Sequence, residues 1–154
     1  MSSKNNKVTN PFKDVREAQH LSREKASELT TYMSPSMIEH IERGDTFPRP
    51  EDVLCLSKCY GCPELINLYC CEMCAIGKEV APKAIHSTPP EIVIHLLSIS
   101  ARLEIIRTDL IHSTSDHLSS NQSTELFSTL HEILNEISSC NVSLSIWLNK
   151  QKLK

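Results

Sequence analysis

The sequence predicts an all-α protein, and three observations lead to that class. The 154 residues include only 3 glycines, and aromatic residues make up only 5% of the chain. Sheet proteins depend on glycine-containing turns and on strands rich in β-branched or aromatic residues, so this composition disfavours a sheet. Apolar residues recur instead every three or four positions over long stretches, which is the period of an amphipathic helix. We therefore expect a domain of short helices followed by two longer ones.

Three short helices are predicted at the start of the chain, over residues 10–20, 22–29 and 34–44. Each begins with a residue whose side-chain oxygen can accept a hydrogen bond from a free backbone N–H group, and proline follows the first and third of these caps. The apolar stripe of the first helix is predicted to be Phe12, Val15 and Ala18. The capping residues are Asn10, Ser22 and Ser34.

Two further helices complete the N-terminal domain. Prolines predict a loop over residues 45–50, after which apolar residues predict a fourth helix over 53–60 that Gly61 closes. Pro63 starts a fifth helix, which we expect to continue through a cluster of cysteines as far as Lys78. The first 78 residues thus hold five predicted helices.

The remaining chain predicts an antiparallel helical hairpin. Prolines without periodic apolar residues indicate a linker over 79–90, and Thr88 caps the helix that follows. A polar stretch over 112–123 indicates the turn. In both helices apolar residues step alternately by four and three, the seam of a coiled coil. The seam residues are Ile92, Leu96, Ile99, Leu103, Ile106 and Leu110, then Leu126, Leu130, Ile133, Ile137, Cys140, Leu144 and Trp147.

These elements predict the domain organisation. Residues 1–9 are polar and form a flexible arm, 10–78 form the five-helix domain, 79–90 the linker and 91–154 the hairpin. Further apolar residues widen each seam, so the hairpin has to pack on the N-terminal domain or on a second copy, and we expect a homodimer. The widening residues are Val93, Leu97, Ile105, Phe127, Leu134 and Leu148.

Composition and charge exclude several classes of protein. No apolar stretch approaches the roughly 20 residues of a membrane-spanning helix, and the first ten residues lack a hydrophobic signal core, so we expect a cytoplasmic protein. No glycine-rich phosphate loop, nucleophile elbow or paired carboxylates are found, which argues against an enzyme and against a cofactor. The net charge of −3 gives no general support to nucleic-acid binding, which would have to rest on a local motif.

The cysteines leave two interpretations open. Cys59 with Cys62 and Cys71 with Cys74 form two CxxC pairs, and four thiolates can hold a tetrahedral zinc ion. A helix predicted between the pairs would hold them apart, which favours buried apolar thiols over a metal site. We therefore expect no metal, and a cysteine-based metal or redox sensor remains an alternative.

The segment from Ser22 to Gly44 has the outline of two helices joined by a short turn. Together with the proline loop and the fourth helix, it resembles the phage-repressor and Cro-like (Xre) helix-turn-helix family over about Phe12 to Leu65. The resemblance implies a lambda-repressor-like fold, double-stranded DNA as partner and a transcription regulator, more often a repressor. It rests on Leu21, Ser22, Ser27, Ser34, Ile38, Ile41, Glu42, Arg43 and Gly44. The stretch 21–29 with Tyr69, Cys70, Cys74 and 76–78 is also similar to short bacterial members with helical tails.

The resemblance implies roles for nine residues. Arg23 would contact phosphate, Arg43 and Arg49 would contact the DNA backbone, and Ser34 would cap the recognition helix over 34–43. The side chains implied to lie against base edges are Pro35, Ser36 and His40, with Met37 and Glu39 beside them.

Three departures from the family pattern leave another function open. The turn is one residue longer than usual, and Tyr32 lies near a position where glycine is common. Glu39 and Glu42 leave the recognition helix short of basic residues, and Glu39 adds a negative charge where phosphates would approach. A glutamate can also accept a hydrogen bond from cytosine. The alternative is a helical adaptor that binds proteins and not DNA.

Overall fold

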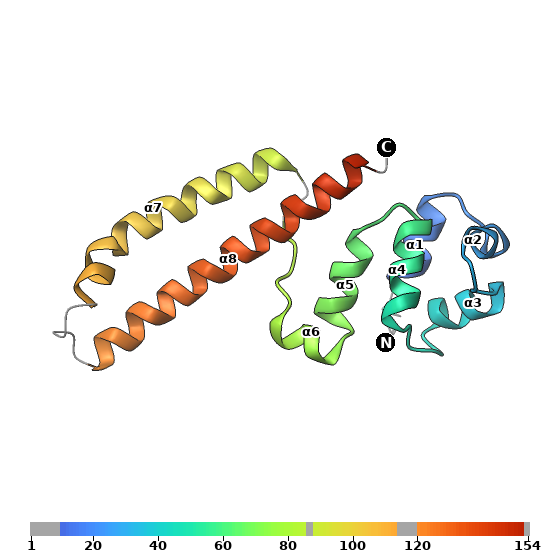
Figure 1. Ribbon diagram of the computed structural model, residues 1–154, viewed down its shortest axis with the longest axis horizontal. Helices are drawn as coiled ribbons and strands as arrows, with labels where there is room; N and C mark the ends of the chain where they lie inside the picture. Colours follow the sequence, from blue (N-terminus) through green and yellow to red (C-terminus); the bar gives the residue numbers. More distant parts are fainter. Residues whose placement is uncertain (1–9, 86–87, 114–119, 153–154) are drawn as a thin grey trace, which may run out of the picture. The chain divides into compact units, whose positions relative to one another are not determined.

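The computed structural model describes residues 10–85, 88–113 and 120–152, and over this range it contains eight helices and no strand (Figure 1). The all-α prediction is confirmed. The predicted arm, 1–9, and the centre of the predicted turn, 114–119, lie outside the described residues. The chain divides into two compact units between Lys78 and Glu79.

The first three helices are α1 (Pro11–Ala18), α2 (Arg23–Leu29) and α3 (Pro35–Arg43). Their predicted caps are confirmed by hydrogen bonds of 3.0–3.2 Å, in which Asn10, Ser22 and Ser34 accept from backbone N–H groups two or three residues ahead. At the other end of α3, Gly44 has φ +80°, a left-handed conformation that side chains rarely tolerate. Short-range signals thus fix both ends of α3.

Helix α4 (Pro50–Cys59) begins three residues earlier than predicted, at Pro50. The reason is a capping box: the Asp52 carboxylate accepts a hydrogen bond of 2.9 Å from the backbone N–H of Arg49. A proline in the first helical turn needs no hydrogen-bonded N–H group, so Pro50 does not end the helix but starts it.

The predicted fifth helix is divided into α5 (Glu64–Glu72) and α6 (Ala75–Val80), which corrects the expectation of one helix running to Lys78. The N–H groups of Met73 and Cys74 both donate to the carbonyl of Tyr69, at 2.9 Å, and the chain turns there. Gly77 then lies directly against the backbone carbonyl of Cys70. A glycine that was expected to end a helix is needed instead for this close approach.

One face of each of the first five helices, α1 to α5, packs into the core of this unit. Each of its large side chains contributes roughly 1.5–3 kcal/mol through burial. One predicted position was wrong: Ala18 is exposed, and the buried side of α1 is completed by Arg16. The core residues are Phe12, Ala26, Met33, Ile38, Ile41, Val53, Leu56, Tyr60, Leu65 and Tyr69.

Arg16 is buried because Glu42, from α3, is buried beside it. The guanidinium donates from Nε to one carboxylate oxygen at 2.6 Å and from Nη2 to the other at 3.0 Å, and Nη1 donates to the carbonyl of Leu21. The hydrogen bond that Arg16 donates to Glu42 raises the pKa of Arg16 despite its burial. Glu42 also accepts from Arg23 Nε at 2.9 Å, so α1, α2 and α3 meet at one carboxylate.

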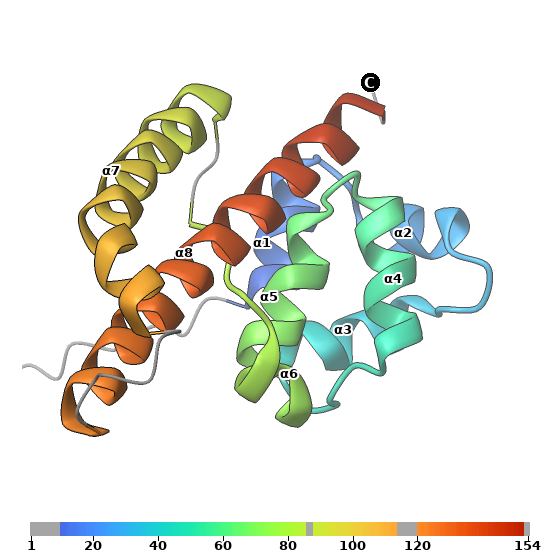
Figure 2. The same cartoon turned by 60° about the vertical axis from the view of Figure 1, so that its left-hand side comes forward.

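The second unit contains two long helices, α7 (Pro89–Ser113) and α8 (Ser120–Lys152), which lie side by side and antiparallel in Figures 1 and 2. The predicted linker, 79–90, is shorter in the structure, because α6 continues to Val80 and α7 begins at Pro89. The predicted turn, 112–123, is also shorter, because α8 begins within it at Ser120. The hairpin core contains the seam residues Ile92, Ile99, Ile133 and Cys140, with Leu103, Ile106 and Ile137 packed against it.

Two seam residues are less buried than the pattern predicted. Leu96 is 39% exposed and Leu144 is 38% exposed, because two helices cover only one side of each seam. One edge of the hairpin is closed by polar contacts instead: Arg102 Nη1 lies 2.6 Å from Glu136 Oε1, and His95 Nε2 lies 3.3 Å from Glu136 Oε2.

We predict that Glu42→Ala lowers the free energy of unfolding of the N-terminal unit by about 3–5 kcal/mol, because Arg16 is left as an uncompensated buried charge. Urea unfolding of the full chain measures this. The 3 tyrosines, Tyr32, Tyr60 and Tyr69, all lie in this unit, so near-ultraviolet tyrosine signals follow it.

The control is Glu28→Ala, which removes only an exposed ion pair with Lys25. It is expected to cost less than about 1 kcal/mol. Equal effects of Glu28→Ala and Glu42→Ala would contradict the importance assigned to the buried carboxylate.

A second prediction concerns Gly77. Replacing a helical glycine by alanine usually stabilises a protein by about 1 kcal/mol. Here the added methyl group would collide with the backbone of Cys70, so Gly77→Ala is expected to destabilise the unit by about 1–3 kcal/mol. In the same helix Ile76 is 76% exposed, and Ile76→Ala is the matched control, with less than about 0.5 kcal/mol of change. A gain in unfolding temperature for Gly77→Ala would rule out the close packing.

Candidate functional site

Helix α3 has two faces with opposite roles. Ile38, Ile41 and Glu42 point into the core and are at most 5% exposed. Ser36, His40 and Arg43 are exposed; spacings of four and three residues put them on one stripe of the helix. Of the other predicted site residues, Ser34 is exposed at the cap, whereas Pro35, Met37 and Glu39 are half-buried beside the stripe. The structure thus brings the residues predicted on the recognition helix together on one surface.

The negative charge of Glu39 is balanced locally. Its Oε1 lies 3.1 Å from Arg43 Nη2 and 3.8 Å from Arg23 Nη1. Two guanidinium groups therefore flank one carboxylate, and the charge of Glu39 is neutralised locally where the sequence suggested an acidic helix. At the next turn, His40 Nδ1 lies 3.4 Å from Asp45 Oδ2, an ion pair when the imidazole is protonated.

Arg23 and Arg49 both have protein partners. Arg23, predicted to contact phosphate, lies between Glu42 and Glu39 and keeps 31% of its side chain exposed. Arg49, predicted to contact the DNA backbone, lies at the cap of α4 with 66% of its side chain exposed, and its Nε is 3.3 Å from Asp52 Oδ2. Both guanidinium groups are oriented by carboxylates and remain open to solvent.

Sequence reasoning did not assign roles to two residues next to this surface. Tyr32, noted only as a departure from a common glycine, donates a hydrogen bond of 2.9 Å to the carboxylate of Asp52. Asp52 itself is 2% exposed. The aspartate three residues after Arg49 is a capping-box signal that could have been found in the sequence. The contact with Tyr32 could not, because 20 residues separate the two.

Most of the cysteines are distributed around the core of the N-terminal unit, whereas Cys140 lies in the hairpin core. Five of them pack partly buried against the core cluster, and in the part of the chain that the structure describes no three His, Cys, Asp or Glu side chains are placed to hold a metal ion. Burial raises the pKa of Cys59, whose Sγ lies 3.8 Å from the carbonyl of Ala26. Cys74 Sγ accepts from the N–H of Gly77 at 3.4 Å. These contacts are those of packed thiols.

A membrane-spanning helix has to be both long and apolar. Among the described helices, none combines the length and the apolar character that a bilayer-spanning segment requires.

Comparison with known proteins identifies the N-terminal unit. Residues 12–66, from α1 into the start of α5, match the helix-turn-helix family model. No curated protein and no solved structure matches the chain. The match covers the caps of α2 and α3, the buried face of α3 and its exposed stripe. Residues 12–66 are therefore a helix-turn-helix domain, in agreement with the resemblance to the phage-repressor and Cro-like (Xre) regulators that the sequence shows.

Proposed function

We propose that the protein is a repressor that occupies an operator and reads it with α3. The observation that carries this proposal is the division of α3 into a locked face and an exposed stripe. Ile38, Ile41 and Glu42 fix the helix, whereas Ser36 and His40 project from it without any contact that the core requires. A helix presented in this way fits the major groove. A regulator has to reach chromosomal DNA, so we place it in the cytoplasm.

The residues of the stripe have different roles in this proposal. Ser36 and His40 can donate and accept hydrogen bonds at base edges, with Pro35 and Met37 beside them for apolar contact. Arg43, which is 62% exposed, contacts a phosphate, as do Arg23 and Arg49. Ser34 holds the start of the helix.

Local electrostatics support DNA binding although the chain has a net charge of −3. The ion pairs of Glu39 with Arg43 and Arg23 remove the repulsion that a free carboxylate would exert on phosphates. A phosphate that approaches either arginine meets a guanidinium that is already oriented. Glu39 is then an orienting residue, with an oxygen able to accept from cytosine.

We further propose that the hairpin makes the protein a homodimer. The polar residues that close one edge, His95, Arg102 and Glu136, each come one position before a seam residue. In an antiparallel pair, residues one position after the seams of both helices lie together on the opposite edge. Six apolar side chains on that edge are exposed by 47–67%: Val93, Leu97, Ile111, Phe127, Leu134 and Leu148.

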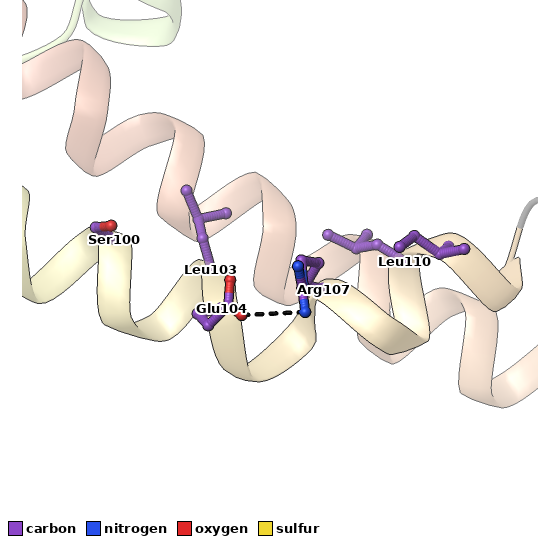
Figure 3. Close-up of a pocket in the computed structure, with 6 residues that line it drawn as sticks. Ser100, Leu103, Glu104, Arg107 and Leu110 are labelled. Carbon is purple, nitrogen blue, oxygen red and sulfur yellow. Dashed lines mark ion pairs between the residues drawn. The ribbon is translucent and has the colours of Figure 1, made fainter.

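The same edge has a groove along α7, with a volume of about 490 Å³. Figure 3 shows Leu103 and Leu110 along it, with the ion pair of Glu104 and Arg107 beside them. In a four-helix bundle each helix buries its seam and one flanking apolar stripe. A hairpin with an exposed apolar stripe on both helices therefore has the features of one half of such a bundle. A second copy supplies the same apolar edge, and two-fold pairing presents two recognition helices to one DNA molecule.

The DNA-reading proposal is tested by selecting fragments from a genomic DNA library at two salt concentrations and sequencing those retained. We expect a palindromic site, with binding that weakens as salt rises because counterions are released from phosphates. A Ser36→Ala and His40→Ala double variant is expected to lose the preferred site, at roughly 1–3 kcal/mol per base contact, and to keep salt-dependent binding to any duplex.

The matched control, Ser98→Ala with His112→Ala, changes the same residue types at exposed positions of α7 and is expected to select the same site as the unaltered protein. No enrichment at low salt would overturn the proposal in favour of a protein-binding adaptor.

The dimer is tested by measuring the mass in solution by light scattering. The chain has a mass of 17.4 kDa, and we expect twice this value. Leu97→Glu with Leu134→Glu is expected to give the single-chain mass, because four carboxylates would enter the apolar interface. Ile105 is 77% exposed but lies outside the apolar edge, so Ile105→Glu should leave the dimer intact. A single-chain mass for the unaltered protein, or the same effect from Ile105→Glu, would refute this surface.

A further inference from the structure

Tyr32 ties the connection between α2 and α3 to the start of α4. Its hydroxyl donates to Asp52 Oδ1 at 2.9 Å, across 20 residues of sequence. Tyr32 is 50% exposed, whereas Asp52 is 2% exposed. The hydroxyl therefore reaches from the surface to a buried carboxylate.

Asp52 also accepts hydrogen bonds from Arg49, so it links Tyr32 to Arg49. Oδ2 accepts from the Arg49 backbone N–H at 2.9 Å and from Nε at 3.3 Å, and Oδ1 accepts from Nη2 at 3.4 Å. Burial acts to raise the pKa of Asp52, but the hydrogen bonds from Arg49 and Tyr32 outweigh it and lower the pKa. Burial, followed by the bond to Asp52, raises the pKa of Tyr32 to about 12. At neutral pH the carboxylate is charged and the phenol is a donor.

The arrangement leaves one side of the Arg49 guanidinium available. Its donors form a rigid planar fork, and Asp52 uses those on the Nε and Nη2 edge. Arg49 is the capping residue of α4, directly after the loop that follows the recognition helix, and its side chain is 66% exposed. A second anion can therefore approach Nη1 while Asp52 holds the opposite edge.

We propose that Tyr32 is a positioning residue for DNA binding: it fixes the Asp52 carboxylate, which aims the Arg49 guanidinium at an operator phosphate. This inference rests on the proposed function and extends it to a residue that the recognition helix does not contain. Without the hydroxyl, Oδ1 keeps only the long contact with Nη2. The carboxylate then rotates more freely, and Arg49 has to be ordered when DNA binds, at a cost in affinity.

The test measures the affinity of the full-length chain for its selected operator duplex over a range of salt concentrations. Tyr32→Phe keeps the ring and removes the hydroxyl, and we expect roughly three- to tenfold weaker binding, the effect of one hydrogen bond. Arg49→Ala should reduce the slope of log affinity against log salt by about 0.9, one phosphate contact. Tyr32→Phe should have no further effect in the Arg49→Ala background, because the two residues act in one chain of contacts.

Two variants separate positioning from folding and from charge. The hydroxyl of Tyr60 is buried and has no hydrogen-bond partner among the described residues, so Tyr60→Phe is a matched control that keeps full affinity. Arg49→Lys retains the charge but lacks the planar fork, so it should weaken binding and should also make Tyr32→Phe silent.

Unchanged affinity in Tyr32→Phe would overturn the inference while leaving the proposed function standing. The same is true if Tyr32→Phe weakens binding equally with and without Arg49, since Tyr32 would then act by another route. If the unaltered protein binds no duplex, the proposed function itself fails, and the inference with it.

Discussion

One buried carboxylate organises the N-terminal unit. Glu42 accepts from Arg16 and Arg23, so three helices that are short and weakly stable on their own converge on a single anion. The apolar core would allow α3 to rotate or slide by a fraction of a turn, because hydrophobic contacts have little directional preference. The ion pairs of Glu42 have a fixed geometry and do not allow such a movement of α3. The orientation of the exposed stripe of α3 therefore depends on an interaction on its hidden side.

The same principle recurs around the candidate site. Glu39 stands between Arg43 and Arg23, and Asp52 stands behind Arg49. In each case an acidic residue that appears unfavourable for DNA binding holds a basic side chain in place. The overall charge of −3 therefore says little about this surface, since what matters is where each carboxylate lies relative to the guanidinium groups.

The sequence predicts those parts of the fold that depend on neighbouring residues. Caps at Asn10, Ser22 and Ser34 were predicted because their partners lie two or three positions ahead. The pair of Arg16 and Glu42 was missed because 26 residues separate its members, and a buried arginine resembles a surface one in a helical pattern. The division between α5 and α6 was missed for a similar reason, since a close approach to Cys70 is invisible along the chain. In the candidate site, resemblance to a family supplied the positions, whereas the balance of charge required three-dimensional contacts.

The two faces of α3 have a consequence for how such a protein can diverge. Ser36 lies outside the core and its capping network, and the ion pair of His40 with Asp45 is exposed. Substitutions at these positions are therefore nearly free of thermodynamic penalty. If the stripe reads DNA as we propose, duplicated copies of the domain can acquire new target sequences by substitutions at the stripe alone, while the buried carboxylate of Glu42 keeps the architecture constant. The stripe is then the part of the domain at which an altered sequence preference can be engineered without loss of stability.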